Sequence, residues 1–156
     1  MKYPVFILLV AALLLAGCAP AVSNPNQTPQ PAQVQQTQSE SPFTRTDGQG
    51  AVTFEVTPLD LDNPGDALQF DVIMDTHSVD LSMDLTPLAT LTTDTGATVQ
   101  ATLWEGPKGG HHVEGKLSFP VSQNGKSILD GAKQLTLTIK NVDAPERTFV
   151  WDLSAK

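Results

Sequence analysis

Apolar and polar residues alternate in short runs along the last two thirds of the chain, and this alternation restricts the fold more than any other feature. Val52, Phe54 and Val56 alternate with Thr, Glu and Thr, and residues 68–75 and 79–85 repeat the pattern. A period of two is that of a β-strand with one buried face. Gly, Pro, Asn and Asp separate the runs, and no helical period lasts beyond a turn or two. The sequence therefore predicts an all-β protein.

Eight short strands are predicted, and Asp94-Thr95-Gly96 marks a hairpin turn between two of them. Their number and spacing indicate an immunoglobulin-like antiparallel β-sandwich of about 7–8 strands over residues 51–156, with a small β-barrel as the alternative. The Cys–Trp–Cys pattern of true immunoglobulin domains is absent. The predicted strands are 52–57, 68–75, 79–85, 88–92, 98–104, 113–119, 134–140 and 148–153. The expected core is Phe54, Phe70, Val72, Met74, Leu81, Met83, Leu103, Trp104, Leu117, Phe119, Leu135, Leu137, Ile139, Phe149 and Trp151.

Residues 1–17 have the pattern of a secretory signal peptide. Lys2 provides a positive start, and Val5 to Leu15 is an uncharged apolar run of eleven residues. A bilayer-spanning helix needs about 20 apolar residues, so this run fits the core of a signal peptide better than a membrane span.

The four residues Leu15-Ala16-Gly17-Cys18 resemble the lipobox of bacterial lipoproteins at every position. The resemblance implies cleavage before Cys18, lipidation of its sulfur, and an extracytoplasmic protein anchored to the membrane through this residue. Ala19, which is not Asp, implies the outer membrane in a Gram-negative cell, and otherwise the outer face of the cytoplasmic membrane. The rest of the chain is loosely similar to small modules that follow such anchors, with Thr76-His77-Ser78 and Gly109-Gly110-His111-His112 as its most distinctive strings.

Residues 18–50 are predicted to be a disordered tether that follows the lipidated cysteine. Between Ala19 and Pro42 there are five Pro, six Gln and one charged residue, Glu40. So little apolar surface cannot offset the entropy cost of ordering the chain. A flexible chain of this length has a mean reach of about 30 Å.

Charge and cysteine content exclude several classes of protein. The chain has 9 Lys and Arg against 17 Asp and Glu, a net charge of −8. A nucleic-acid partner is not expected, because such proteins carry a basic surface. A single Cys leaves no intrachain disulfide and no cysteine-rich zinc module.

Three histidines, His77, His111 and His112, are the sharpest candidate site. All are expected at strand ends or turns, and the turn at 75–78 and the loop at 106–112 can meet at one end of a sandwich. Neutral imidazole suits copper and zinc, so these residues predict a possible transition-metal site, with Asp75 or Glu114 as a further ligand. Histidines that stiffen a Gly-rich turn explain the same pattern without a metal.

A weaker candidate is a calcium site at Asp60, Asp62 and Asp66, whose hard oxygen ligands suit this ion. The segment lacks the full twelve-residue calcium loop, and an Asn-Pro-Gly-Asp turn accounts for the same residues.

No catalytic motif is present: there is no nucleophile elbow, phosphate loop, dinucleotide fingerprint or His-Glu-x-x-His. We therefore expect a non-catalytic binding or structural module that needs no cofactor and whose partner is an envelope protein or a glycan. A copper- or zinc-binding protein that uses His77, His111 and His112 is the alternative function.

Overall fold

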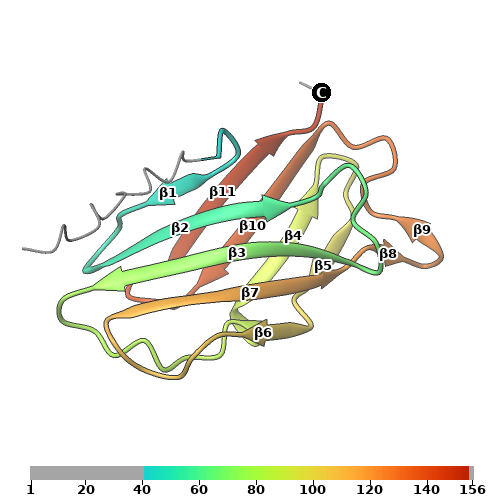
Figure 1. Cartoon of the computed structure of the whole chain (residues 1–156). Helices are drawn as coiled ribbons and strands as arrows, with labels where there is room; N and C mark the ends of the chain where they lie inside the picture. The colour runs from blue at the N-terminus through green and yellow to red at the C-terminus, as the bar shows by residue number, and fades with distance from the viewer. Residues whose placement is uncertain (1–40, 155–156) are drawn as a thin grey trace, which may run out of the picture. The chain divides into compact units, whose positions relative to one another are not determined.

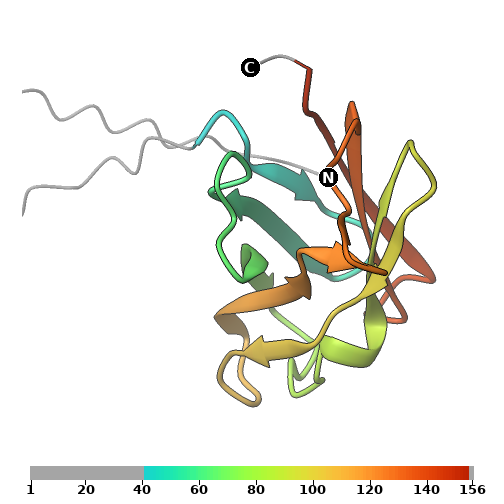
Figure 2. The same cartoon turned by 90° about the vertical axis from the view of Figure 1, so that its right-hand side faces the viewer.

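The computed structural model describes residues 41–154, which form two antiparallel β-sheets packed face to face (Figures 1 and 2). Sheet A has the strand order β1-β2-β3-β7-β6, and sheet B has the order β11-β10-β4-β5. A two-stranded hairpin, β8-β9, stands apart from both sheets. The strands are β1 (Arg45–Asp47), β2 (Val52–Leu59), β3 (Ala67–Thr76), β4 (Ala89–Thr93), β5 (Thr98–Gln100), β6 (Leu103–Glu105), β7 (His112–Pro120), β8 (Ser122–Gln123), β9 (Lys126–Ser127), β10 (Gln134–Lys140) and β11 (Glu146–Asp152).

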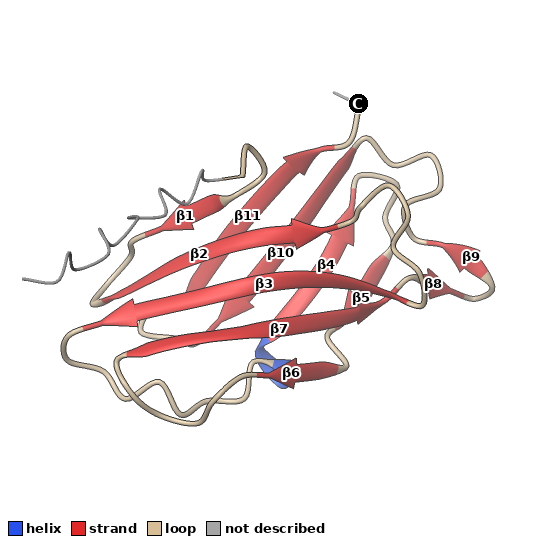
Figure 3. Ribbon diagram, viewed as in Figure 1, coloured by secondary structure: helices blue, strands red, loops and turns tan. Residues whose placement is uncertain are grey.

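The predicted all-β class and the antiparallel β-sandwich are confirmed. A single 3-10 turn, Thr86–Leu88, is the helical element of residues 41–154, and Figure 3 shows it in blue between the sheets' lower ends. No helix in this part of the chain is long and apolar enough to cross a bilayer. The described segment has more strands than the 7–8 predicted because short strands such as β1, β8 and β9 lack a clear alternating pattern.

The core lies between the sheets and is built from the apolar positions of the alternating strands. In β3 every second residue is buried, and in β11 the residues at 147, 149 and 151 are buried while their neighbours are exposed. The Phe70 ring meets the Phe119 ring edge-on at 5.7 Å and the Trp151 ring at 5.3 Å. These contacts join β3 and β7 of sheet A to β11 of sheet B.

The predicted strand at 79–85 is wrong, although its alternation correctly marks which side chains are buried. This segment carries the chain from sheet A to sheet B and forms no ladder. Leu81 and Leu85 are buried, whereas Asp80 and Asp84 are exposed. Leu81 exchanges backbone hydrogen bonds with the loop at Gly109 and Gly110, because no strand lies beside it.

The predicted strand at 98–104 is divided between the two sheets. Ala101 donates its N–H to Ala89 in sheet B, whereas Thr102 donates to Ser118 in sheet A. The change of sheet reverses which side of the chain faces the core. Leu103, expected in the core, is therefore 47% exposed, and Trp104 faces inward instead. Met83, also expected in the core, is only partly buried.

The folded part begins earlier than the predicted boundary at residue 51. Strand β1 pairs with β2 in the register Arg45 to Val56 and Asp47 to Phe54. We call residues 41–50 the N-terminal arm. The arm lies along β11 as well, because Trp151 Nε1 donates to the Phe43 carbonyl at 2.6 Å and Arg45 Nε donates to the Val150 carbonyl at 2.9 Å.

A fully buried guanidinium, that of Arg147, fastens this arm to the sandwich. It occupies an inward position of β11, and its carbon Cζ lies 4.8 Å from the centre of the Phe54 ring. Its nitrogens donate to Asp47 Oδ1 at 2.5 Å, to the Asp47 and Gln49 carbonyls, and to the Val142 carbonyl. Four oxygen atoms thus surround the charge, which satisfies the requirement that a buried ion be paired and hydrogen-bonded.

The Asp47 carboxylate completes this cluster in its ionised form. Burial alone would raise its pKa, but hydrogen bonds from Gln49 and the charge of Arg147 outweigh that effect and hold the pKa below its usual value. A lowered pKa in the folded state means that the pair stabilises the fold above the unfolded pKa and loses this contribution as the pH falls.

Replacing Asp47 by Ala should lower the free energy of unfolding by about 3 kcal/mol, because it leaves the buried Arg147 charge without its counter-ion. Urea denaturation measures this change. The matched control is Asp66→Ala, which removes an exposed carboxylate and should cost no more than about 0.5 kcal/mol. Equal losses from both variants would show that the buried pair does not hold the arm.

Candidate functional site

Two candidate sites lie at opposite ends of β3. At its C-terminal end, the histidine loops (residues 75–81 and 106–112) come together. At its N-terminal end, the turn that joins β2 to β3 borders a pocket against the end of β11.

The histidine loops are held side by side by main-chain hydrogen bonds. Thr76 donates its N–H to the His111 carbonyl at 2.9 Å, and Gly109 donates to the Leu81 carbonyl at 3.1 Å. Gly109 and Gly110 have φ of 84° and 106°, a region that favours glycine and allows this tight return. The prediction that these two segments share one end of the sandwich is confirmed.

One of the three histidines has a defined side-chain partner. His112 lies opposite Asp75 in the β3–β7 ladder, and its Nδ1 is 2.5 Å from Asp75 Oδ1. This hydrogen bond and the negative charge of Asp75 raise the pKa of His112 above its ordinary value of 6.5. Bonding through Nδ1 directs Nε2 away from Asp75, the arrangement that supports histidine ligands in metal sites.

The structure does not assemble a larger ligand set from these residues. His77 and His111 are exposed, and residues 41–154 contain no group of three or more His, Cys, Asp or Glu side chains that could hold a metal ion. Met74, whose thioether is of the type that binds copper(I), is buried in the core. Copper or zinc binding by His77, His111 and His112 stays a prediction.

The proposed calcium ligands Asp60, Asp62 and Asp66 lie on the turn between β2 and β3. Asp60 has a φ of 46°, and its Oδ1 accepts the N–H of Asn63 at 3.1 Å, so this carboxylate closes the turn. Asp60 and Asp62 border the pocket, whereas Asp66 is not among the residues that line it. Calcium binding here also stays a prediction.

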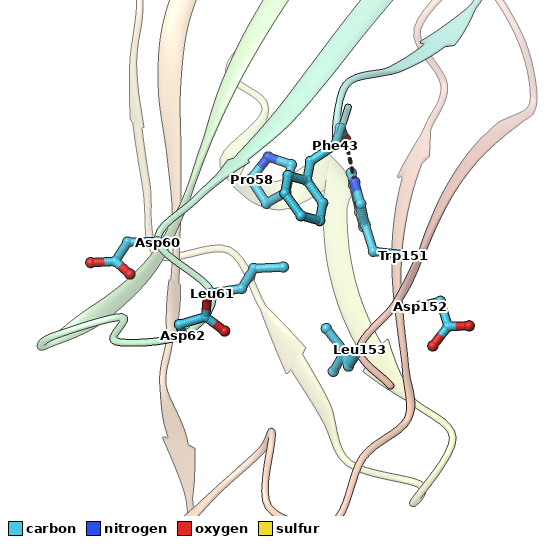
Figure 4. Close-up of a pocket in the computed structure, with 8 residues that line it drawn as sticks. All are labelled: Phe43, Pro58, Asp60, Leu61, Asp62, Trp151, Asp152 and Leu153. Carbon is cyan, nitrogen blue, oxygen red and sulfur yellow. Dashed lines mark hydrogen bonds between the residues drawn. The ribbon is translucent and has the colours of Figure 1, made fainter. Parts of the chain in front are cut away.

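The acid-rimmed pocket has a cavity volume of about 120 Å³ and lies between the end of β2 and the end of β11. In Figure 4 the Phe43 ring stands between Pro58 and Trp151, and the side chains of Leu61 and Leu153 face the space below it. The lining residues are Phe43, Pro58, Asp60, Leu61, Asp62, Trp151, Asp152 and Leu153.

Among residues 41–154, the charged side chains that line this pocket are all acidic. The carboxylates of Asp60 and Asp152 lie on opposite sides of it and point outward in Figure 4. Hydrogen bonds from the Ser154 hydroxyl and N–H hold the pKa of Asp152 below its ordinary value, so this group remains ionised at neutral pH. No Lys or Arg is among the lining residues. The pocket thus combines an apolar interior with a negative rim.

This pocket has no direct signal in the sequence. The sequence places Phe43 in the tether and Trp151 in the core, and only their contact across 108 positions of the chain reveals a shared site. Phe43 is the one aromatic residue in the segment 18–50, and this isolated aromatic was the signal that could have been used.

Two other surfaces of sheet A are explained by packing. Trp104 lies against the backbone of Gly106 and Gly115, where its ring leaves no room for a β-carbon. Across the β3–β7 ladder, Lys116 lies opposite Asp71 and His112 lies opposite Asp75, so acidic and basic side chains alternate there.

Replacing Asp75 by Asn should lower the pKa of His112, because the carboxylate that stabilises the imidazolium is lost. A pH titration of the ring signals by NMR measures it. Since the folded pKa is raised, the pair stabilises the fold below pH 6.5, and this contribution disappears as the pH rises through the folded value.

The control for this titration is Glu114→Gln, which removes a more weakly acting charge and should move the pKa of His112 less. An unchanged pKa in the Asp75 variant would contradict the pairing.

No protein-family model matches the chain, and no curated protein matches it. Among solved structures, it is similar to a DUF4426 family protein from Pseudomonas aeruginosa PAO1, with 11% identity, a TM-score of 0.42, and coverage of 69% of this chain and 93% of that one.

Proposed function

We propose that this chain is a lipid-anchored protein of the bacterial cell envelope whose β-sandwich head is a non-catalytic binding module. The observation that carries the binding role is the acid-rimmed pocket, a mostly apolar cavity whose lining includes acidic residues. Enclosed apolar pockets with a few polar groups are the usual form of small-ligand sites. The anchor rests on Leu15-Ala16-Gly17-Cys18, which lies outside the described residues.

The attachment of the N-terminal arm supports a tethered head. Residues 43, 45, 47 and 49 are each bonded to a side chain or carbonyl of β11 or to the Arg147 guanidinium. A chain held at its N-terminal side by a membrane anchor would pull on this arm first. Bonds from the arm to sheet B, added to its ladder with β2, spread such a load over both sheets.

Replacing Cys18 by Ser should release the protein from membranes or stall it as an unprocessed precursor, because the sulfur that receives the lipid is lost. Membrane fractionation with mass spectrometry of the product measures both outcomes. The control is Ser23→Ala in the same segment, which should leave the protein in the membrane fraction. A Cys18→Ser product that is fully processed and still bound to membranes would contradict the anchor.

Transition-metal binding is the second candidate function, favoured by the main-chain bonds that hold the histidine loops together. Calorimetric titration of residues 18–156 carrying Cys18→Ser, with copper(II) and with zinc(II), tests it. The expected result is one-to-one binding of roughly micromolar strength or tighter. His77→Ala, or His111→Ala with His112→Ala, should abolish it, whereas Asp130→Asn should not. No heat with either metal would contradict this function.

A further inference from the structure

We propose that the outer face of sheet B binds a single chain of an uncharged polysaccharide. This inference goes beyond the acid-rimmed pocket, because it names a second binding surface and the class of its partner. We call the central outward positions of the four strands the threonine face. They are Thr90, Thr92, Thr98, Gln100, Thr136, Thr138, Thr148 and Val150.

The strand register arranges these side chains in two rows across the sheet, whose middle strands are β10 and β4 (Figure 1). In one row, Thr136 lies opposite Val150 on one side and Thr92 on the other, and Thr98 follows Thr92. The second row runs in the order Thr148, Thr138, Thr90 and Gln100. Neighbouring strands lie about 4.8 Å apart, so each row presents a side chain at that interval over about 14 Å.

Most hydroxyl groups of the threonine face have no partner within the protein. Thr90 Oγ1 donates to Gln100 Oε1 at 3.3 Å. Among residues 41–154, the side-chain hydroxyls of the other five threonines form no hydrogen bond. Threonines elsewhere in the sandwich are bonded, as Thr76 is to the Ala51 carbonyl at 2.7 Å. The face therefore presents five hydroxyls that are free to donate to a ligand and to accept from it.

The outer faces of the two sheets differ in charge. The outward positions of β2, β3, β6 and β7 include Lys116, His112 and the carboxylates of Glu55, Asp71, Asp75, Glu105 and Glu114. The threonine face carries no charged side chain, although the chain has a net charge of −8. A surface that serves solubility alone usually carries interspersed charges, as sheet A does. The lack of charge on sheet B therefore indicates a contact surface for an uncharged partner.

The charges nearest to this face are already paired. Lys140 and Glu146 are the next outward residues on β10 and β11, and their side chains lie 3.3 Å apart. At the other end of β11, Asp152 accepts hydrogen bonds from Ser154. A neutral chain laid across the four strands between these groups thus contacts hydroxyls without removing an unpaired charge from water.

The composition of the face argues against other classes of partner. Protein interfaces usually centre on Trp, Tyr or Arg side chains, and the threonine face has none of them. A nucleic acid or an anionic lipid surface requires Lys or Arg, which are also absent from this face. Metal ions prefer carboxylate, imidazole or thiolate ligands over the hydroxyls present here. A polymer of uncharged sugars, which carries hydroxyls along its whole length, matches the face.

The geometry of the sheet favours one flexible chain over a flat crystalline surface. Adjacent strands are rotated by roughly 20–25°, so the two rows of threonines follow a twisted path. A single polysaccharide chain can follow this path by small rotations about its linkages. The threonine side chains are β-branched and have few rotamers, so little side-chain entropy is lost when they bind.

The test titrates hexamers of β-linked glucose, mannose and N-acetylglucosamine into residues 18–156 carrying Cys18→Ser. The charged comparison is a hexamer of galacturonic acid. At least one neutral hexamer should bind about tenfold more tightly than its own disaccharide, because only the longer chain reaches all four strands. It should also bind more tightly than the acid, with an affinity that changes little with salt. NMR shifts should locate the contact on β4 and β10.

Two variants of the face and one control test the role of the hydroxyls. Thr92→Val with Thr136→Val and Thr138→Val removes three hydroxyls, keeps strand-forming side chains, and should weaken binding about tenfold or more. Thr136→Lys puts a long charged side chain at the centre of the face and should also weaken it. The matched control is Thr53→Val, an outward threonine of sheet A, which should not change the affinity. The urea midpoint of each variant shows whether it folds.

A further variant separates this surface from the acid-rimmed pocket. Leu61→Trp should fill the pocket and leave binding of the hexamer unchanged. Loss of binding in this variant, with retention in the threonine variants, would place the sugar in the pocket. That result would support the proposed binding function and overturn the present inference. No binding of any neutral hexamer, or equal binding of the acidic one, would overturn the inference and leave the pocket untouched.

Discussion

The buried Arg147 guanidinium is the interaction on which the arrangement of the N-terminal arm depends. A charge with no solvent exposure must be surrounded by acceptors, and three of its four acceptor atoms belong to Asp47 and Gln49 of that arm. Since the arm cannot leave without exposing this charge to an apolar interior, β1 is fixed beside β2. Phe43 lies four residues before Asp47 and is thereby brought to Trp151, where it forms a wall of the acid-rimmed pocket. The same guanidinium thus closes one side of the sandwich and builds the candidate binding site.

The buried Arg147 costs stability but fixes where the N-terminal arm binds. An apolar side chain at position 147 would bury itself in β11 at less desolvation cost, and it would offer nothing to bind the arm. The guanidinium has five N–H donors in a fixed plane. Its hydrogen bonds therefore form only when the acceptor oxygens of Asp47, Gln49 and Val142 lie in one particular arrangement. Short strands such as β1, with three residue pairs, have little register information of their own. The buried ion pair supplies the register that the three-residue ladder lacks.

The alternation of the sequence was enough to predict the all-β sandwich and most strands, because a period of two directly reports one buried face. β10 was predicted at the residues where it occurs, and Leu81 and Leu85 are buried although no strand forms there. The two wrongly predicted strand segments have one cause. At 79–85 and at 101–103 the chain passes between sheets, and the hydrogen-bond partners of such segments are set by distant residues.

The histidine loops were predicted to meet because turn signals place them at the ends of two strands. Arg147 and Phe43 were missed, since a basic residue in an apolar phase and a lone aromatic in a Pro-rich segment are informative only once their partners are known.

The two candidate sites differ in how they relate to the proposed anchor. β3 has ten residues, which at about 3.3 Å each separates its ends by roughly 30 Å. The acid-rimmed pocket includes Phe43, close to where the described chain begins, whereas the histidine loops lie at the other end of this strand. The described chain therefore begins near the pocket and not near the histidine loops. Occupancy of the pocket adds contacts to the arm through Phe43, so a ligand there should strengthen the attachment of the arm, and tension on the arm should weaken ligand binding by the same free energy. A metal bound at the histidine loops touches no residue of the arm, and the same coupling is not expected for it.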